Sequence, residues 1–121
     1  MSFPILVCDD SMVARKQVVR CFKAYEDFKI HQATNGREAV AILAQQEIGL
    51  MCLDLTMPEL DGIGVLEYIR DHKIECFVVV ISADIQPEMK QRVMALGALT
   101  FLEKPVSADE LHETLHKFGI K

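Results

Sequence analysis

The chain has 121 residues, the size of one domain with a substantial hydrophobic core. Half of its residues are hydrophobic and 26% are charged, which is ordinary for a globular protein. The formal net charge is −5, from 13 basic and 18 acidic residues, and the basic residues are scattered along the chain. This balance argues against a nucleic-acid surface, because phosphate binding needs a clustered positive field.

Other classes are excluded by what the sequence lacks. No apolar segment is long enough to span a bilayer, and the start, MSFPILVCDDS, lacks the basic flank and cleavage site of a signal peptide. The four cysteines are widely spaced and form no C-x-x-C pair, so they predict neither a zinc site nor a redox motif. We therefore expect a cytoplasmic protein with reduced thiols and no membrane contact.

Strand patterns and helix patterns alternate along the chain. In order, the sequence predicts a strand at 3–7, a helix at 11–24, a strand at 28–33, a helix at 37–46, a strand at 50–55, a helix at 63–71, a strand at 76–82, a helix at 87–96, a strand at 99–103 and a final helix that opens at Ser107. The first, third and fourth strands are almost continuously apolar, as expected for strands buried on both faces. The second alternates and the fifth is mixed, which favours positions at the sheet edges.

The helical segments carry apolar residues at helical spacing, and two of their starts have recognisable signals. Ser107 and Glu110 have the spacing of a capping box. Asn35-Gly36 is compatible with a hairpin turn, but the segment after it is rich in helix formers, so we expect a strand-to-helix loop.

This alternation predicts an α/β fold, a doubly wound (βα)5 unit with a parallel sheet covered on both faces. For five strands the flavodoxin-like order 2-1-3-4-5 fits best. In this order the first and third strands flank the switch point, and ligands bind beyond the carboxyl ends of the strands.

Polar residues follow four of the predicted strands at these ends. Asp9 and Asp10 follow the first strand, Asp54 interrupts the end of the third, Ser82 ends the fourth, and Lys104 follows the fifth. An ionised carboxylate is costly to bring near a core without compensation. We therefore expect Asp54 to lie at the rim of the core, facing the two other carboxylates.

Three carboxylates in one pocket raise one another's pKa values, and a divalent cation with oxygen ligands relieves the repulsion. Mg²⁺ fits, because it takes one or two carboxylates, keeps several waters and accepts phosphate oxygens; Mn²⁺ is the expected substitute. A lysine and a hydroxyl beside the metal add a positive charge and a donor for an anion. This combination is typical of phosphoryl transfer.

At these residues the chain resembles the receiver domains of two-component response regulators. The resemblance rests on CDDS after the first strand, LDLTMPELDG around Asp54, ISA at the end of the fourth strand and EKP after the fifth. It covers essentially the whole length, so we expect residues 1–121 to be a single receiver domain of the chemotaxis-regulator type, with no effector domain.

The resemblance implies a role for each matching position. Asp54 would be the phosphoacceptor, with Lys104 binding a phosphoryl oxygen and Ser82 as the switch hydroxyl. Asp10 would ligate Mg²⁺ directly, Asp9 would act through a bound water, and the backbone carbonyl of Thr56 would complete the set. The peptide before Pro105 is typically cis in this family.

The resemblance implies roles for further residues from their positions relative to these motifs alone. Phe101 falls at the switch aromatic, where many members carry tyrosine. The side chains of Thr56 and Asp84 would tune hydrolysis of the acyl phosphate, with a surface role as the alternative. The phosphodonor would be a sensor histidine kinase or a histidine phosphotransfer protein, and residues 84–101 with the last helix would bind a downstream protein. A phosphatase is a further expected partner.

The resemblance implies self-phosphorylation and self-dephosphorylation but no other enzymatic activity. A haloacid-dehalogenase-like phosphatase, the alternative enzyme, would need D-x-D-x-T after its first strand, where this chain has DDSM. A flavin site would need a phosphate-cradling first loop, and CDDSMVA would repel phosphate. A phosphate-independent pseudo-receiver is the third alternative, but such chains typically lose an acid or the lysine, and all are present here.

Overall fold

The computed structural model describes residues 3–84 and 86–120, in which strands and helices alternate strictly. The strands are β1 (Phe3–Cys8), β2 (Phe28–Ala33), β3 (Leu50–Leu53), β4 (Phe77–Ser82) and β5 (Thr100–Glu103). The helices are α1 (Met12–Cys21), α2 (Gly36–Gln45), α3 (Gly62–Asp71), α4 (Pro87–Ala95) and α5 (Ala108–Lys117).

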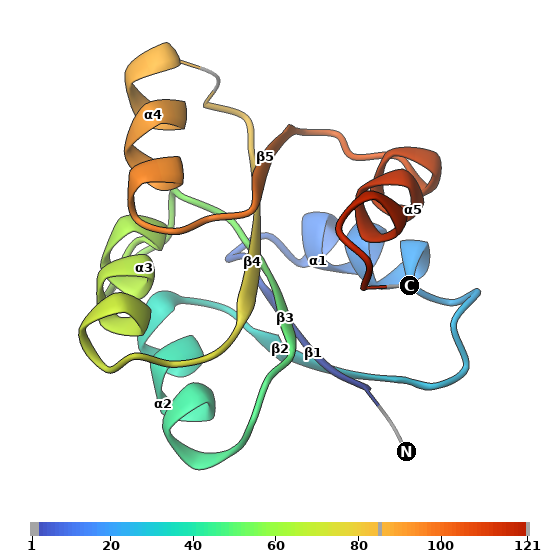
Figure 1. The fold of residues 1–121 in the computed structure, drawn as a ribbon, viewed down its shortest axis with the longest axis horizontal. Helices are drawn as coiled ribbons and strands as arrows, with labels where there is room; N and C mark the ends of the chain where they lie inside the picture. Colours follow the sequence, from blue (N-terminus) through green and yellow to red (C-terminus); the bar gives the residue numbers. More distant parts are fainter. Residues whose placement is uncertain (1–2, 85, 121) are drawn as a thin grey trace.

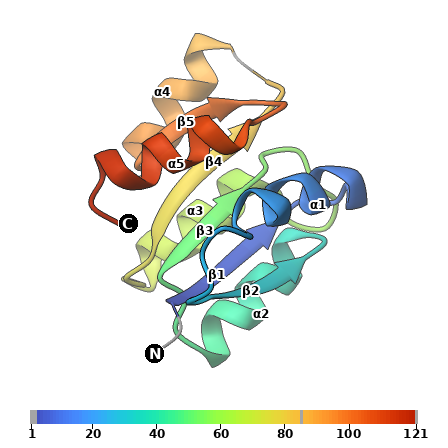
Figure 2. The same ribbon diagram turned by 90° about the vertical axis from the view of Figure 1, so that its right-hand side faces the viewer.

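These strands form one parallel sheet of order β2-β1-β3-β4-β5, which confirms the predicted flavodoxin-like order. The sheet lies between two layers of helices: α1 and α5 cover one face, and α2, α3 and α4 cover the other (Figure 1). The two strands expected at the edges, β2 and β5, are the edge strands. The view in Figure 2 shows β1 and β3 side by side in the middle of the sheet.

Alternate residues of the central strands build two separate hydrophobic cores, as the two-residue period of a strand requires. On the α2–α3–α4 face, β1 and β3 contribute Leu6, Cys8, Met51 and Leu53. On the α1–α5 face they contribute their intervening residues, Ile5, Val7, Leu50 and Cys52. Residues 5–8 of β1 and all four residues of β3 are therefore buried.

The helix starts follow the signals in the sequence. Asn35 caps α2 by accepting a hydrogen bond from the backbone N–H of Glu38, so Asn35-Gly36 is a strand-to-helix loop as predicted. Ser107 and Glu110 form the expected capping box of α5. The first helix ends at Cys21, earlier than predicted, because Phe22 caps it through bonds to the carbonyls of Val19 and Arg20. None of the helices in the described residues has the length and apolar character that a membrane span requires.

All four cysteines are unpaired thiols, and three of them are buried: Cys8, Cys21 and Cys52. Burial, together with the neighbouring carboxylates of Asp9 and Asp54, raises the pKa of the Cys8 thiol to about 12. Burial alone raises the pKa of the half-buried Cys76 to about 12. These thiols therefore stay protonated at neutral pH and behave as small apolar side chains.

Candidate functional site

The first and third strands end side by side, and each is followed by an aspartate. Cys8 at the end of β1 lies opposite Leu53 at the end of β3, and the backbone N–H of Asp54 donates to the carbonyl of Cys8 at 3.0 Å. Because both strands run in the same direction, the residues that follow them, Asp9 and Asp54, emerge at the same edge. The carboxylate at the end of the apolar run is thus placed by the strand register.

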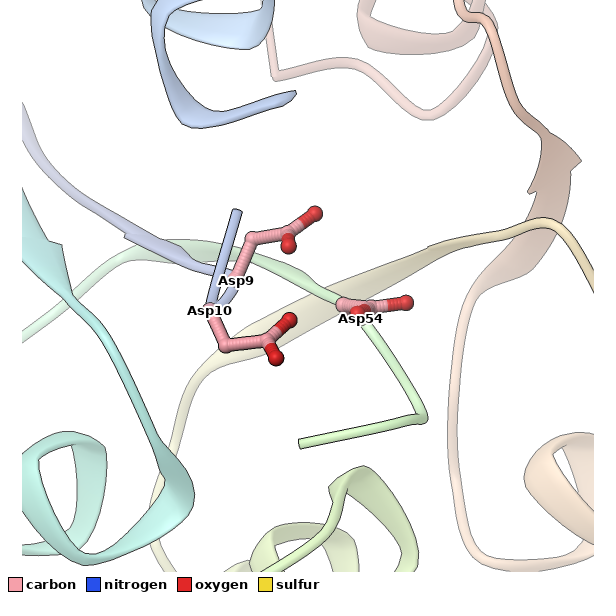
Figure 3. Close-up of side chains that lie close together, drawn as sticks. All are labelled: Asp9, Asp10 and Asp54. Atoms are coloured by element: carbon pink, nitrogen blue, oxygen red, sulfur yellow. The ribbon is translucent and has the colours of Figure 1, made fainter. Parts of the chain in front are cut away.

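Asp9, Asp10 and Asp54 lie together, each offering one oxygen within 4.8 Å of the others. Figure 3 shows their carboxylates extending to the same side of the sheet edge. Only 4% of Asp9 and 5% of Asp54 is exposed, whereas Asp10 is exposed. The cluster thus has two buried acids and one acid at the solvent boundary.

Lys104 supplies the positive charge in this cluster. Its Nζ lies 2.6 Å from Asp9 Oδ2 and 3.4 Å from Asp54 Oδ1, so one ammonium bridges the two buried acids. Partial burial lowers the pKa of Lys104, but the hydrogen bond to Asp9 and the charges of Asp54 and Asp9 outweigh burial and raise it overall. The peptide between Lys104 and Pro105 is cis, as the family resemblance implied.

The surroundings of Asp54 disfavour the ionised form of its carboxyl group. Burial raises the pKa of its carboxyl, and the negative charge of Asp9 raises it further, while Lys104 acts in the opposite direction. Three carboxylates and one ammonium leave a formal excess of two negative charges. The donors are all oxygen atoms, and one of them faces solvent, which fits a hard divalent cation that retains waters.

The loop from β3 to α3, which carries Thr56, is held by two close backbone approaches. Gly62 N–H donates to the carbonyl of Leu55 at 3.0 Å, and a Cβ on Gly62 would collide with the carbonyl of Asp54. Gly36 N–H donates to the carbonyl of Leu60 at 3.0 Å, where a Cβ would also collide. Thr56 itself is exposed. Its backbone is therefore fixed from both sides while its side chain remains accessible.

Ser82, at the end of β4, is 1% exposed, and its hydroxyl accepts a hydrogen bond from the backbone N–H of Asp84 at 3.1 Å. Asp84 is half-buried, and its Oδ1 accepts from the backbone N–H of Gln86 at 3.2 Å. Ser82 and Asp84 thus accept backbone hydrogen bonds in the segment between β4 and α4. The sequence predicted Ser82 beside the carboxylates but gave no sign of its hydrogen bond to Asp84.

Phe101 lies on the edge strand β5, half-buried, and packs against the core on the α4 side. The ammonium of Lys90, from α4, lies over its ring, 5.5 Å from the centroid. The aromatic residue expected at the switch position is therefore in contact with the helix expected to carry the output.

Arg15 contacts the acidic cluster although the sequence did not predict it as a site residue. Its guanidinium reaches from α1 to the carbonyl oxygen of Asp9 at 2.7 Å. A basic residue on a helix usually indicates a solvated face, and Arg15 stands beside the equally basic Lys16. Only the contact with the Asp9 carbonyl in the folded chain distinguishes Arg15 from Lys16.

The family profile for the response regulator receiver domain matches residues 5–116 of the chain. The chain belongs to this family. Among curated relatives it is 32% identical over 108 residues to the regulatory protein AtoC of Escherichia coli and 32% identical over 111 residues to the transcriptional regulatory protein SrrA of Staphylococcus aureus. The matches cover 89% and 92% of this chain but only 23% and 45% of those proteins.

Solved receiver structures have the same fold. The structure of a CheX–CheY–BeF₃–Mg²⁺ complex from Borrelia burgdorferi matches with a TM-score of 0.89 and 31% identity, covering 98% of this chain and 90% of that one. The chemotaxis protein CheY4 of Vibrio cholerae matches with a TM-score of 0.87 and 25% identity, covering 97% and 98%. The chain is thus a receiver domain of two-component response regulators, a phosphoacceptor fold used in signalling.

Proposed function

We propose that this receiver domain accepts a phosphoryl group on Asp54 from a phosphohistidine donor, in a reaction that requires Mg²⁺. The observation that carries the proposal is the placement of a buried Asp54 carboxylate within reach of both Lys104 and the acids that follow β1. The donor would be a sensor histidine kinase or a histidine phosphotransfer protein.

In the transfer step, a carboxylate oxygen of Asp54 attacks phosphorus and forms a new O–P bond. The N–P bond of the phosphohistidine breaks, and its electron pair returns to the imidazole, which takes up a proton from water. Lys104, whose Nζ already lies 3.4 Å from Asp54, neutralises negative charge on a phosphoryl oxygen. The chain's contribution is chiefly positioning and charge, as phosphoryl transfer requires.

The donor set fits magnesium. Asp9, Asp10, Asp54 and the backbone carbonyl of Thr56 would hold the ion, and the exposed position of Asp10 leaves room for metal-bound waters. When bound, Mg²⁺ would supply positive charge to the oxygens of the transferring group; Mn²⁺ would substitute.

The output surface in this proposal consists of α4, β5 and α5. Phosphorylation adds about −1.5 to −2 charges at neutral pH. This charge draws the Ser82 hydroxyl and Lys104 toward the phosphoryl group, and Phe101 changes its packing under Lys90. A downstream protein then distinguishes the two arrangements of this surface.

The direct test is incubation of the pure protein with acetyl phosphate, with and without Mg²⁺, followed by intact-mass measurement. We expect one phosphoryl group per chain, dependent on Mg²⁺ and absent from Asp54→Asn. Absence of an adduct in the wild type would overturn the proposal in favour of a phosphate-independent module. Continuous release of phosphate without an adduct would favour a phosphatase.

The variant Lys104→Ala distinguishes Mg²⁺ binding from the change at Phe101 that follows phosphorylation. We expect this variant to bind Mg²⁺ but to lose the change at Phe101 on phosphorylation, because the ammonium that follows the phosphoryl group is missing. A fluorine label placed near Phe101 would report the change by NMR. An unchanged response in the variant would contradict this role.

Thr56 and Asp84 are proposed to set the lifetime of the acyl phosphate rather than its formation. Thr56 is exposed beside the site, and Asp84 lies in the turn fixed by Ser82. Thr56→Ala and Asp84→Ala should therefore change the rate of adduct loss and leave Mg²⁺ affinity unaltered. Equal lifetimes in both variants and the wild type would leave these two residues a surface role only.

A further inference from the structure

The peptide that joins Asp9 to Asp10 is held by a side chain from outside the acidic cluster. Arg15 Nη1 donates a 2.7 Å hydrogen bond to the carbonyl oxygen of Asp9 in a partly buried contact. Arg15 Nε donates to Gln32 Oε1, on β2, at 3.2 Å. A guanidinium presents its donors in a rigid plane, so engagement of two partners fixes its orientation.

This carbonyl belongs to the peptide unit between the two consecutive acids. Rotation of that unit would displace the Asp10 carboxylate relative to that of Asp9. The other polar groups of Asp9 are held separately: its N–H donates to Ala33 at 3.1 Å, Oδ1 accepts from the N–H of Ser11 at 2.9 Å, and Oδ2 contacts Lys104. Asp9 is therefore anchored, whereas Asp10 is exposed and depends on the peptide plane for its direction.

We propose that Arg15, oriented by Gln32, is a positioning residue that fixes the peptide between Asp9 and Asp10 and so presets the spacing of their carboxylates for a divalent cation. The inference rests on the proposed function, because it gives Arg15 a role at the proposed magnesium site. Arg15 touches neither the cation nor the phosphoryl group and acts through the backbone alone.

Two effects of Arg15 on cation binding have opposite signs, which makes the proposal decidable. As a positive charge near the cluster, Arg15 repels a cation, so its removal would tighten Mg²⁺ binding. As a positioning residue it prearranges the ligands, so its removal weakens binding. Loss of a hydrogen-bond partner that orients a metal ligand typically costs about 10- to 100-fold in affinity.

The experiment is a calorimetric Mg²⁺ titration of the wild type and four variants. We expect about tenfold weaker binding for Arg15→Met, at the lower end of that range because the contact is only partly buried. Gln32→Leu, which changes no charge, should weaken binding less but in the same direction. Arg15→Lys, which keeps the positive charge and one donor nitrogen, should recover part of the loss. Lys16→Met removes a neighbouring exposed charge of α1 and should bind as tightly as the wild type or more tightly.

A metal-free measurement isolates the backbone effect. Amide hydrogen exchange at Asp10 and Ser11, in chelator, should be faster in Arg15→Met than in Lys16→Met if Arg15 holds this peptide. Equal exchange in the two variants would overturn the proposal, as would Mg²⁺ affinity in Arg15→Met equal to or above that of the wild type. If Arg15→Met does not fold, unchanged affinity in Gln32→Leu overturns it. Failure of the wild type to bind Mg²⁺ would instead refute the proposed function.

Discussion

The central strand β3 and the edge strand β5 differ in how deeply they are buried, although each is followed by a residue of the acidic site, Asp54 or Lys104. Every residue of β3 is buried, and α3, which follows it, buries five residues. On β5 no residue is fully buried, and α4, which precedes it, buries only Val93. The loop between β3 and α3 carries Asp54. Phe101 lies on β5, where the ammonium of Lys90 from α4 lies over its ring.

This difference in burial matches the two tasks in the proposed function, which are cation binding and a conformational response. Ligand geometry requires a rigid support, which densely buried strands provide. A response requires segments that open or repack at low cost, and these have few buried apolar contacts. The receiver holds its carboxylates at the ends of the central strands β1 and β3, and the aromatic residue that we propose to respond, Phe101, lies on the edge strand β5.

The largest expected effect tests the difference in packing directly. Leu66→Ala, in α3, should lower the free energy of unfolding by about 3 kcal/mol, because Leu66 is 1% exposed. Leu96→Ala, at the end of α4, should cost about 1 kcal/mol, because Leu96 is only half-buried. Urea denaturation of the two leucine variants measures both. Equal losses would break the comparison between centre and edge.

The next effect concerns the loss of stability caused by the buried carboxylate of Asp54, which follows β3. In chelator at neutral pH, Asp54→Asn should raise the free energy of unfolding by about 1 kcal/mol, because it removes a charge that burial and Asp9 disfavour. Lys104 keeps its partner Asp9 in this variant. Added Mg²⁺ should raise the melting temperature of the wild type more than that of the variant.

Asp61→Asn is the matched control for this substitution. Asp61 is exposed and caps α3 by accepting from Gly64 N–H, and asparagine caps a helix equally well. We expect no change in the free energy of unfolding for this control. A large loss of metal-free stability in Asp54→Asn would show that the carboxylate stabilises the central strand.

A smaller effect is expected at the edge. Lys90→Met should lose a cation–π contact worth about 0.5–1 kcal/mol at an exposed site. Because this contact joins α4 to β5, amide exchange in β5 should become about two- to fivefold faster, while exchange in β3 stays unchanged. Lys90→Arg retains the cation and should behave as the wild type. Faster exchange in both strands would mean that edge and centre open together.

The smallest expected effect concerns Glu38, at the start of α2, away from both β3 and β5. It shows how small a contribution from an exposed charge is beside the other predictions. Glu38 Oε1 accepts from the backbone N–H of Thr34 at 2.6 Å and from its hydroxyl at 2.7 Å, and these bonds lower the pKa of Glu38 below its ordinary value. Because the folded state favours the ionised form, this stabilisation is present above the ordinary glutamate pKa. It is lost as the pH falls through the lowered pKa.

Glu38→Gln removes this ionisation and therefore its pH dependence. At pH 7 the variant should be a few tenths of a kcal/mol less stable than the wild type, since the carboxylate is exposed to solvent. The difference should shrink toward zero in acid. A difference that grows on acidification would contradict the assigned cause.

The sequence was sufficient to predict the order of the elements and the strand order. Strands buried on both faces, such as residues 76–82, leave a continuous apolar pattern, and alternation with helices restricts the connections. Boundaries were less accurate: the third strand was predicted to reach residue 55 but ends at Leu53. The Asp54 N–H still donates to the carbonyl of Cys8, and the chain then turns toward Thr56. The prediction extended the strand because the apolar Leu55 follows Asp54.

The acidic cluster was predictable because residues at the carboxyl ends of parallel strands must meet. The contacts that fix the cluster were not, because they depend on distances between remote segments. Neither the reach of Arg15 to Asp9 nor the approach of Gly36 to Leu60 leaves a periodic pattern. Ser82 shows the same limit, since its strand end was predictable but its bond to Asp84 was not.

The protonated thiols of the native protein have a practical consequence for spectroscopy. Maleimide and iodoacetamide reagents attack thiolates, and burial raises the pKa values of Cys8, Cys21, Cys52 and Cys76. A single cysteine introduced at an exposed position such as Glu103, at the end of β5, is accessible to these reagents and should react first. Fluorescent or fluorinated tags can thus be attached to the β5 edge of the receiver without replacing any native cysteine.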